Sequence, residues 1–294
     1  MNPPVTKKRR QAATAKQAEQ GIALVSVLWI VALLTVVATG LSASVRSESR
    51  IVGNTIALLQ AQYAAEGGVE LAAMNLLYPQ TARWPADGSI RSLSIGSVRV
   101  RIATFDEAGK IDINHAPAQL LHNLLLQAGV DVDQADLLAD AILDWRDSDD
   151  FRRLNGAEDS DYRAAGLPYG AKDGLFDSVD ELRLVLGMDA EIFATIEPAL
   201  TVFSGQRGVN PLHASPQVLA AISGLDNLKS ASGESAFTVQ VEARVGDTIV
   251  SQAEATISMT LIGVGRPYRI LQWRQPQQRL FPDAAEDDIQ GLIE

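Results

Sequence analysis

Carboxylates recur at short spacing in two neighbouring segments near the middle of the chain. The first reads Asp144-Trp145-Arg146-Asp147-Ser148-Asp149-Asp150, and the second reads Asn155-Gly156-Ala157-Glu158-Asp159-Ser160-Asp161-Tyr162. A calcium ion takes about six to eight oxygen ligands and tolerates irregular geometry, so alternating carboxylates in a glycine-containing loop suit it. The side chains that could converge on one ion are Asp147, Asp149, Glu158, Asp161 and, from the far end of the loop, Asp173.

The same residues are compatible with a solvated acidic loop. The spacing from Asp147 to Glu158 matches the length of a helix-loop-helix calcium site, but Phe151 and Arg152 stand where such a site needs a ligand and a glycine. If an ion binds, it neutralises charges that otherwise crowd together in a stretch of low apolar content. The free energy of ion binding would then contribute directly to the folding of the loop. Spacing alone leaves both interpretations open.

Residues for enzymatic catalysis do not form a recognisable pattern. The sequence contains no G-x-S-x-G motif, phosphate-binding loop or dinucleotide-binding fingerprint. Its three histidines, His115, His122 and His213, have no cysteine or H-E-x-x-H partner that would make a zinc site. A carboxylate pair for sugar hydrolysis could be drawn from the acidic segments, but in so dense a cluster any pair carries little weight. We therefore expect a protein that is not an enzyme.

Negative charge is concentrated in one part of the chain. Residues 131–191 contain 17 Asp or Glu and 6 Lys or Arg, a difference equal to the formal net charge of −11 of the whole sequence. Such a segment repels nucleic acid and attracts cations. Cysteine is absent, so an exported body would be held together without disulfides.

A basic leader precedes a long apolar run at the N-terminus. Residues 22–45 contain no charged side chain, and as a helix of about 36 Å they could cross a bilayer core of about 30 Å. The preceding basic residues favour a cytoplasmic N-terminus and an extracytoplasmic body. The junction Gln20-Gly21 suits a peptidase that removes residues 1–21 and leaves Ile22 first. An uncleaved signal-anchor and a secretory signal cut near Ser42-Ala43-Ser44 are the competing interpretations.

These motifs must be positioned by a long helix, a sheet and a helical region. The apolar stripe predicts that the first helix continues to about Leu77, with Gly67-Gly68 as a weak point or kink. Alternating apolar residues predict strands over 90–102 and a hairpin over 237–259. We expect an α+β fold, in which the long helix packs on an antiparallel sheet and a large α-helical domain is inserted between strands. The predicted parts are a cleaved leader over 1–21, the transmembrane and amphipathic helix over 22–80, the first part of the sheet over 81–114, the inserted helical domain with the acidic loop over 115–230, and the second part of the sheet with a C-terminal tail over 231–294.

Taken together, these features resemble the type IV pilins and pseudopilins, and within them the minor pseudopilin K family of type II secretion systems, also called general secretion pathway protein K. The motifs that carry the resemblance are Gly109-Lys110-Ile111-Asp112-Ile113-Asn114 leading into Ala116-Pro117, the two acidic segments, Pro168-Tyr169, and Ser178-Val179-Asp180-Glu181-Leu182. They extend over nearly the whole chain. The resemblance implies calcium bound near the inserted domain. The ligand candidates that it implies in this sequence are Asp147, Asp149, Glu158, Asp159, Asp161 and Asp173.

The resemblance also implies how the chain is processed and where it acts. A prepilin peptidase would cut after Gly21 and methylate Ile22, and a single span would hold the protein in the inner membrane with its C-terminal domain in the periplasm. There it would join minor pseudopilins I, J and H at the pseudopilus tip. The secretin and secreted cargo are further candidate contacts, and no nucleic-acid partner is expected.

Ser26 bears on the position of such a subunit in the filament. Most pilins and pseudopilins have a glutamate there, and a carboxylate within the bilayer is costly unless a neighbouring subunit supplies a partner. A subunit with none above it has no such partner, so Ser26 favours the tip. The alternative function is a stand-alone, membrane-anchored periplasmic module, stabilised by calcium, that recruits exported cargo without a pseudopilus.

Overall fold

The chain begins with one long helix, α1 (Lys8–Leu76). The computed structural model describes residues 8–79, 81–229, 236–246, 249–259, 267–276 and 279–281, and within α1 the side chains of residues 25–40 and 48–76. The chain divides into two units, Met1–Leu59 and Gln60–Glu294. In the first unit the described apolar side chains, such as Trp29 and Leu33, are exposed.

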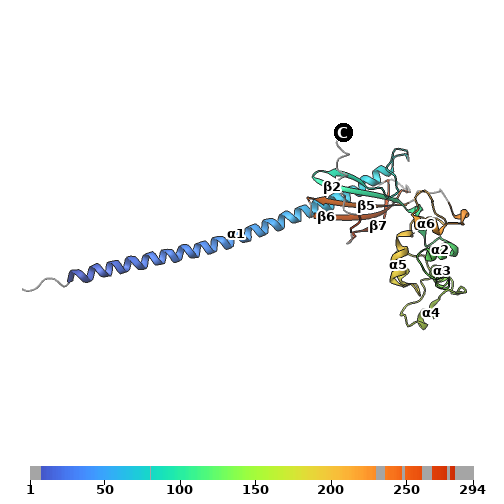
Figure 1. Cartoon of the computed structure of the whole chain (residues 1–294), viewed down its shortest axis with the longest axis horizontal. Coiled ribbons are helices and arrows are strands. Elements are labelled where there is room, and N and C mark those ends of the chain that lie inside the picture. The colour runs from blue at the N-terminus through green and yellow to red at the C-terminus, as the bar shows by residue number, and fades with distance from the viewer. Residues whose placement is uncertain are drawn as a thin grey trace, which may run out of the picture. The chain divides into compact units, whose positions relative to one another are not determined.

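A five-stranded antiparallel sheet forms part of the second unit, with strand order β1-β2-β5-β6-β7 (Figure 1). Its strands are β1 (Arg91–Ile95), β2 (Val98–Asp106), β5 (Ala236–Val245), β6 (Ile249–Ser258) and β7 (Arg269–Arg274). Adjacent strands pair in antiparallel register, with Val100 opposite Ala243 and Val241 opposite Ala253. Successive side chains of a strand point to opposite faces, so these apolar residues share one face. The predicted strands and hairpin are present.

The C-terminal part of α1 packs on this apolar face. Ala65, Val69 and Ala72 belong to the same buried cluster as the inward-facing residues of β2, β5 and β6. Gly68 lies so close to β5 that a Cβ atom there would be 2.7 Å from Val241 Cγ1. The helix continues through Gly67 and Gly68, where the sequence predicts a weak point. Gly68 instead allows the helix and the sheet to approach closely.

The inserted domain lies between β2 and β5 in the sequence and has its own core. Its elements are η1 (Glu107–Gly109), β3 (Ile111–Asp112), α2 (Ala118–Gln127), α3 (Val132–Arg146), α4 (Asp159–Ala164), η2 (Val179–Leu184), α5 (Ala190–Ile196), η3 (Glu197–Ala199), β4 (Leu200–Thr201), α6 (Pro216–Ala221) and η4 (Asp226–Leu228). Figure 1 shows α2, α3, α5 and α6 gathered into one group. β3 pairs in parallel with β4 in a separate two-stranded sheet.

The apolar cluster of the inserted domain extends from Ile111 to Leu228. The domain therefore begins before the predicted boundary at residue 115, because β3 pairs within it rather than with the five-stranded sheet. The overall architecture is the predicted one. A long helix packs on an antiparallel sheet, and a helical domain is inserted between two of its strands.

Candidate metal centre

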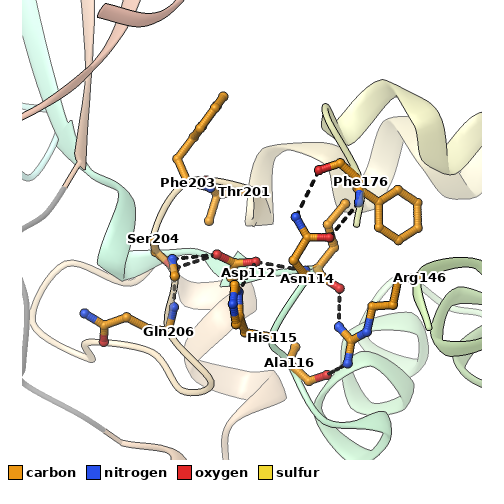
Figure 2. Close-up of polar contacts among 12 residues, drawn as sticks. Asp112, Asn114, His115, Ala116, Arg146, Phe176, Thr201, Phe203, Ser204 and Gln206 are labelled. Atoms are coloured by element: carbon orange, nitrogen blue, oxygen red, sulfur yellow. Dashed lines mark hydrogen bonds and ion pairs between the residues drawn. The ribbon is translucent and has the colours of Figure 1, made fainter. Parts of the chain in front are cut away.

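The acidic loop starts where α3 ends, and hydrogen bonds from Arg146 hold this end of the helix in place. Asp131 caps the N-terminus of α3 by accepting a hydrogen bond from Gln134 N at 3.1 Å. At the other end, the Arg146 guanidinium donates to the carbonyl oxygens of Ile113 and Ala116, the latter at 2.7 Å (Figure 2). Burial lowers the pKa of Arg146 to about 10. This contact holds the end of α3 against the segment that follows β3.

Asn114, in that same segment, holds the far end of the loop. Its side-chain oxygen accepts from Phe176 N at 2.8 Å and its amide donates to Phe176 O at 3.0 Å (Figure 2). Asp112 in turn accepts hydrogen bonds from Asn114 N (2.8 Å) and Gly205 N (2.7 Å). Both ends of the acidic loop are therefore bound to one short, buried segment.

An aromatic cluster supports the loop from within. The ring of Trp145 stacks on Phe176 with centroids 6.2 Å apart, and it contacts Tyr162 at 5.8 Å. Tyr169 packs edge-on against Trp145 and at a tilted angle against Tyr162. Tyr162 is fully buried, and its hydroxyl accepts a hydrogen bond from Leu186 N at 3.1 Å. The loop thus contains an apolar anchor, although its composition suggests little apolar content.

Asp144, on the last turn of α3, is the most deeply buried carboxylate of this region. It is 0% exposed, and Gly156 lies so close that a Cβ there would be 1.9 Å from Asp144 Oδ2. Burial raises the pKa of Asp144 to about 6, against the lowering effect of Arg153. Arg153 donates from its backbone N at 3.1 Å and places its guanidinium 3.2 Å from Asp144 Oδ1 and 3.1 Å from Asp147 Oδ2.

Glu158 precedes α4 and faces the same group of charges. It is 5% exposed, and its Oε1 is buried without a hydrogen bond to any residue that the structure describes. Burial raises the pKa of Glu158 to about 7, and repulsion from Asp144, Asp173, Asp147 and Asp150 adds to the effect. The Oδ1 atom of Asp147 is likewise buried, with no hydrogen-bond partner among the described atoms.

Asp173 approaches the group from the far end of the loop. Its backbone adopts φ of 53°, a left-handed conformation that aspartate tolerates better than most residues. Burial raises the pKa of Asp173, and repulsion from Asp150, Asp159 and Asp147 contributes. The structure thus brings Asp147, Glu158 and Asp173 within electrostatic reach of one another.

The remaining predicted ligands have other contacts. Asp149 accepts a hydrogen bond at 3.0 Å from the backbone N two residues further on, in an exposed turn. Asp161 caps α4 by accepting from the backbone at 3.0 Å, and its other oxygen pairs with Arg152 at 3.0 Å. Asp159 forms an ion pair of 2.6 Å with Arg163 on the exposed side of α4.

Two carboxylates of the charged group, Asp144 and Asp150, are not among the predicted ligands. Asp144 precedes Asp147, the residue that follows the end of α3, by three positions, about the length of one helical turn. That spacing is the sequence signal that could have identified Asp144. Asp150 is exposed and has no comparable signal.

The donor set fits a hard, oxygen-seeking cation. Within the described part of the chain, no three His, Cys, Asp or Glu side chains lie close enough together to hold a metal ion. One oxygen of each carboxylate, Glu158 Oε1 and Asp147 Oδ1, is nevertheless buried without a hydrogen bond from described atoms. Buried, mutually repelling carboxylates are stabilised by a bound cation, and all-oxygen donors favour Ca²⁺ or Mg²⁺ over softer metals.

The predicted processing and membrane residues are only partly covered by the structure. The side chains of Gly21, Ile22 and the ends of the apolar run lie outside the described residues. Ser26 is described and exposed on α1. Over the described residues, no helix combines the length and the apolar character that crossing a bilayer requires.

The fold and the acidic loop together define a pilin-like subunit with a large inserted domain, and comparison with known proteins agrees. Residues 93–205 match the family described as "Type II secretion system (T2SS), protein K". Type II secretion system protein K of Klebsiella pneumoniae is 30% identical over 226 residues, 69% of each chain. The corresponding protein of Pectobacterium carotovorum is 28% identical, over 66% of this chain and 67% of that protein. The chain belongs to the type II secretion system protein K family.

A solved structure shares the fold. The chain resembles one in the crystal structure of the GspK-GspI-GspJ complex from enterotoxigenic Escherichia coli, with a TM-score of 0.53 and 17% sequence identity. The similarity covers 79% of this chain and 99% of that one. At this level of identity the match bears on the fold, and it agrees with the predicted α+β class with an inserted helical domain.

Proposed function

We propose that this protein is a non-enzymatic minor pseudopilin at the tip of the type II secretion pseudopilus. There it helps to initiate the pseudopilus and supports protein secretion across the outer membrane. The observation that carries the proposal is the combination of a pilin-like helix and sheet with a large inserted domain in a member of the protein K family. Ser26, in place of a membrane glutamate, supports a tip position over a shaft position.

The partners that we propose are minor pseudopilins I and J, together with H. The solved complex with the same fold contains GspI and GspJ beside GspK, which supports the first two. Exposed apolar residues of α1, such as Ile51, Ile56 and Tyr63, supply a surface for partner helices. We further propose that prepilin peptidase cuts after Gly21 and methylates Ile22, that residues 22–45 anchor the chain in the inner membrane, and that the periplasmic head meets the secretin or secreted cargo.

We also propose that the acidic loop binds calcium. Asp147, Glu158 and Asp173 would have to move closer together to hold the ion, with Asp144 supporting them from α3. The ion would supply positive charge to these mutually repelling carboxylates, so binding would stabilise the inserted domain. The guanidinium of Arg153 pairs with both Asp144 and Asp147. It would have to move away from these carboxylates or share them with the ion.

Assembly can be tested with the full-length chain. Co-expression with subunits I and J of its own system, followed by detergent extraction and gel filtration, should give one complex that contains all three. Separate elution of the three proteins would contradict the proposal. N-terminal sequencing should find a methylated Ile22. A retained leader would favour the stand-alone, cargo-recruiting module instead.

Calcium binding can be tested by titration calorimetry and thermal unfolding. Calcium at about 100 times its dissociation constant should stabilise the protein by about 2.7 kcal/mol, and EGTA should remove this gain. Asp147→Asn combined with Glu158→Gln should abolish both the heat of binding and the stabilisation. Asp133→Asn, at an exposed site on α3 outside the group, is the matched control and should bind normally. An unchanged thermal midpoint on adding EGTA would leave only a solvated loop.

A further inference from the structure

Arg153 places its guanidinium against two carboxylates of the candidate metal centre. Its Nε lies 3.2 Å from Asp144 Oδ1, and its Nη2 lies 3.1 Å from Asp147 Oδ2. A guanidinium carries its donors in a fixed fork, so one arginine can pair with two acceptors at once. Arg153 therefore brings positive charge to carboxylates beside which the calcium ion is proposed to bind.

The backbone of Arg153 is held in place independently of its side chain. Its N donates to Asp144 Oδ2 at 3.1 Å, and its carbonyl oxygen accepts from Gly156 N at 3.2 Å. Two residues further on, Asn155 N donates to Asp140 Oδ2 at 3.1 Å. This stretch of backbone is thus bound to α3 at two points. The Arg153 side chain can change rotamer while its backbone stays where it is.

Arg153 lies on the solvent side of the carboxylates that it contacts. Its side chain is 44% exposed, whereas that of Asp147 is 27% exposed and that of Asp144 is 0% exposed. Water screens an ion pair that has an exposed member, so such a pair is weak. The guanidinium can therefore be released to water, but the carboxylate of Asp144 cannot follow it.

The charge of Arg153 offsets only part of the negative charge around it. Glu158 is 5% exposed, and Asp144, Asp173 and Asp147 repel it. Its Oε1 is buried without a hydrogen bond from any described atom. Arg153 pairs with two of these four carboxylates, and its single charge cannot balance them all. A divalent cation carries twice that charge and accepts six to eight oxygen ligands, so it suits the group better.

We propose that Arg153 is an internal cation that takes the place of calcium in the ion-free protein and sets the affinity of the site. The inference rests on the calcium site proposed above and adds the residue that regulates it. The guanidinium stabilises the empty loop and turns toward solvent when the ion binds. The apparent dissociation constant is then the intrinsic one divided by the fraction of molecules in which the guanidinium has turned away. A fraction of about one tenth weakens binding about tenfold.

Titration calorimetry of the full-length protein in detergent, with calcium chloride as the ligand, tests the proposal. Arg153→Gln removes the internal cation and should tighten calcium binding about tenfold. Arg153→Lys keeps the charge but cannot reach across two carboxylates as a fork, so its affinity should be intermediate. Arg152→Gln is the matched control, because Arg152 carries the same charge one residue away but pairs with Asp161 at 3.0 Å. Its screened, exposed charge should alter the affinity by no more than about twofold.

Thermal unfolding separates competition with the ion from a purely structural role. In EGTA, Arg153→Gln should lower the thermal midpoint by about 2–4 °C, because Asp144 and Asp147 lose their partner. In saturating calcium it should unfold at nearly the same temperature as the unmodified protein, since the guanidinium no longer contacts the carboxylates in either. An equal loss in both conditions would identify a structural role and overturn the proposal.

The outcomes of the titration distinguish this proposal from calcium binding itself. An unchanged or weaker affinity of Arg153→Gln would overturn the internal cation and leave the calcium site standing. An equal gain from Arg152→Gln would overturn it as well, because any lost positive charge would then have the same effect. Binding by Arg153→Gln alone would support the internal cation and contradict calcium binding by the natural chain. No heat of binding in either protein would overturn both.

Discussion

The pilin-like part and the inserted domain achieve stability in different ways. In the pilin-like part, α1 and the sheet share a core rich in alanine and valine, and buried polar side chains pair across strands, as Thr238 does with Thr256 at 2.9 Å and Glu242 with Arg101 at 2.8 Å. The inserted domain has an aromatic cluster and a polar clamp, but it also buries the carboxylates of Asp144 and Glu158. We therefore expect the stability of the inserted domain to depend on pH through Asp144 and Glu158, whose pKa values burial raises.

The largest effect should come from the aromatic cluster. Tyr162→Ala removes a fully buried ring, which costs about 3–5 kcal/mol. Tyr162→Phe keeps the ring and removes only the hydrogen bond from Leu186, at a cost of about 1 kcal/mol. Hydrogen exchange should show that Tyr162→Ala exposes amides of α3 and α4 while β5 and β6 stay protected. Equal loss of protection in the sheet would show that the two parts do not respond separately.

An intermediate effect should follow pH in the absence of calcium. The folded-state pKa of Glu158 is about 7, and its ordinary value is 4.5. The folded protein therefore binds more protons than the unfolded chain between these values, so stability falls as pH rises from 4.5 to 7 and is constant above that range. The loss should be on the order of 3 kcal/mol. Thermal midpoints measured in EGTA should show it, and Glu158→Gln should reduce the slope to the part that Asp144 contributes. Parallel profiles for the two proteins would remove Glu158 as the cause.

The smallest effect tests the close approach of α1 to the sheet. Gly68→Ala places a Cβ 2.7 Å from Val241 Cγ1 and should destabilise the pilin-like part by about 1–2 kcal/mol. Gly67→Ala is the matched control, since its Cβ would lie 3.7 Å from Ile95 Cδ1, an ordinary contact. It should stabilise the helix by up to about 1 kcal/mol. Chemical denaturation would compare the two, and the same sign for both would contradict the role given to Gly68.

The longer helices and strands were predictable from the sequence because their pattern of apolar residues repeats over many positions. The alternation of apolar residues in β2, β5 and β6 and the apolar stripe of α1 predicted that a helix packs on a sheet and that a helical domain is inserted between strands. The pair β3 and β4 was not predictable, because two-residue strands such as Ile111–Asp112 carry no period. The position of Asn114 just before a helix is visible in the sequence. Its hydrogen bonds to Phe176 are not, because they join residues 62 positions apart and leave no local pattern.

The acidic segments identified the region of the candidate site and the residues Asp147, Glu158 and Asp173, but they did not identify Asp144. Asp144 and Asp161 have the same side chain, yet one is buried among like charges and the other caps a helix and pairs with Arg152. The difference between these two environments arises from tertiary packing, which the local sequence does not show. The N-terminus of α5 is capped within the chain, because Asp189 accepts hydrogen bonds from its first amides, Glu191 N at 2.9 Å and Ile192 N at 2.7 Å. An anion would find that helix end occupied.

The clamp formed by Arg146 and Asn114 has a consequence for the entropy of the acidic loop. Bringing together the ends of a flexible segment as long as that between Arg146 and Phe176 costs about 3 kcal/mol, because closure entropy grows with the logarithm of length. Both ends are already bound to the segment after β3. An ion that enters the loop therefore needs to order only its interior. Breaking the clamp at Asn114 should weaken ion binding even though no ligand is touched.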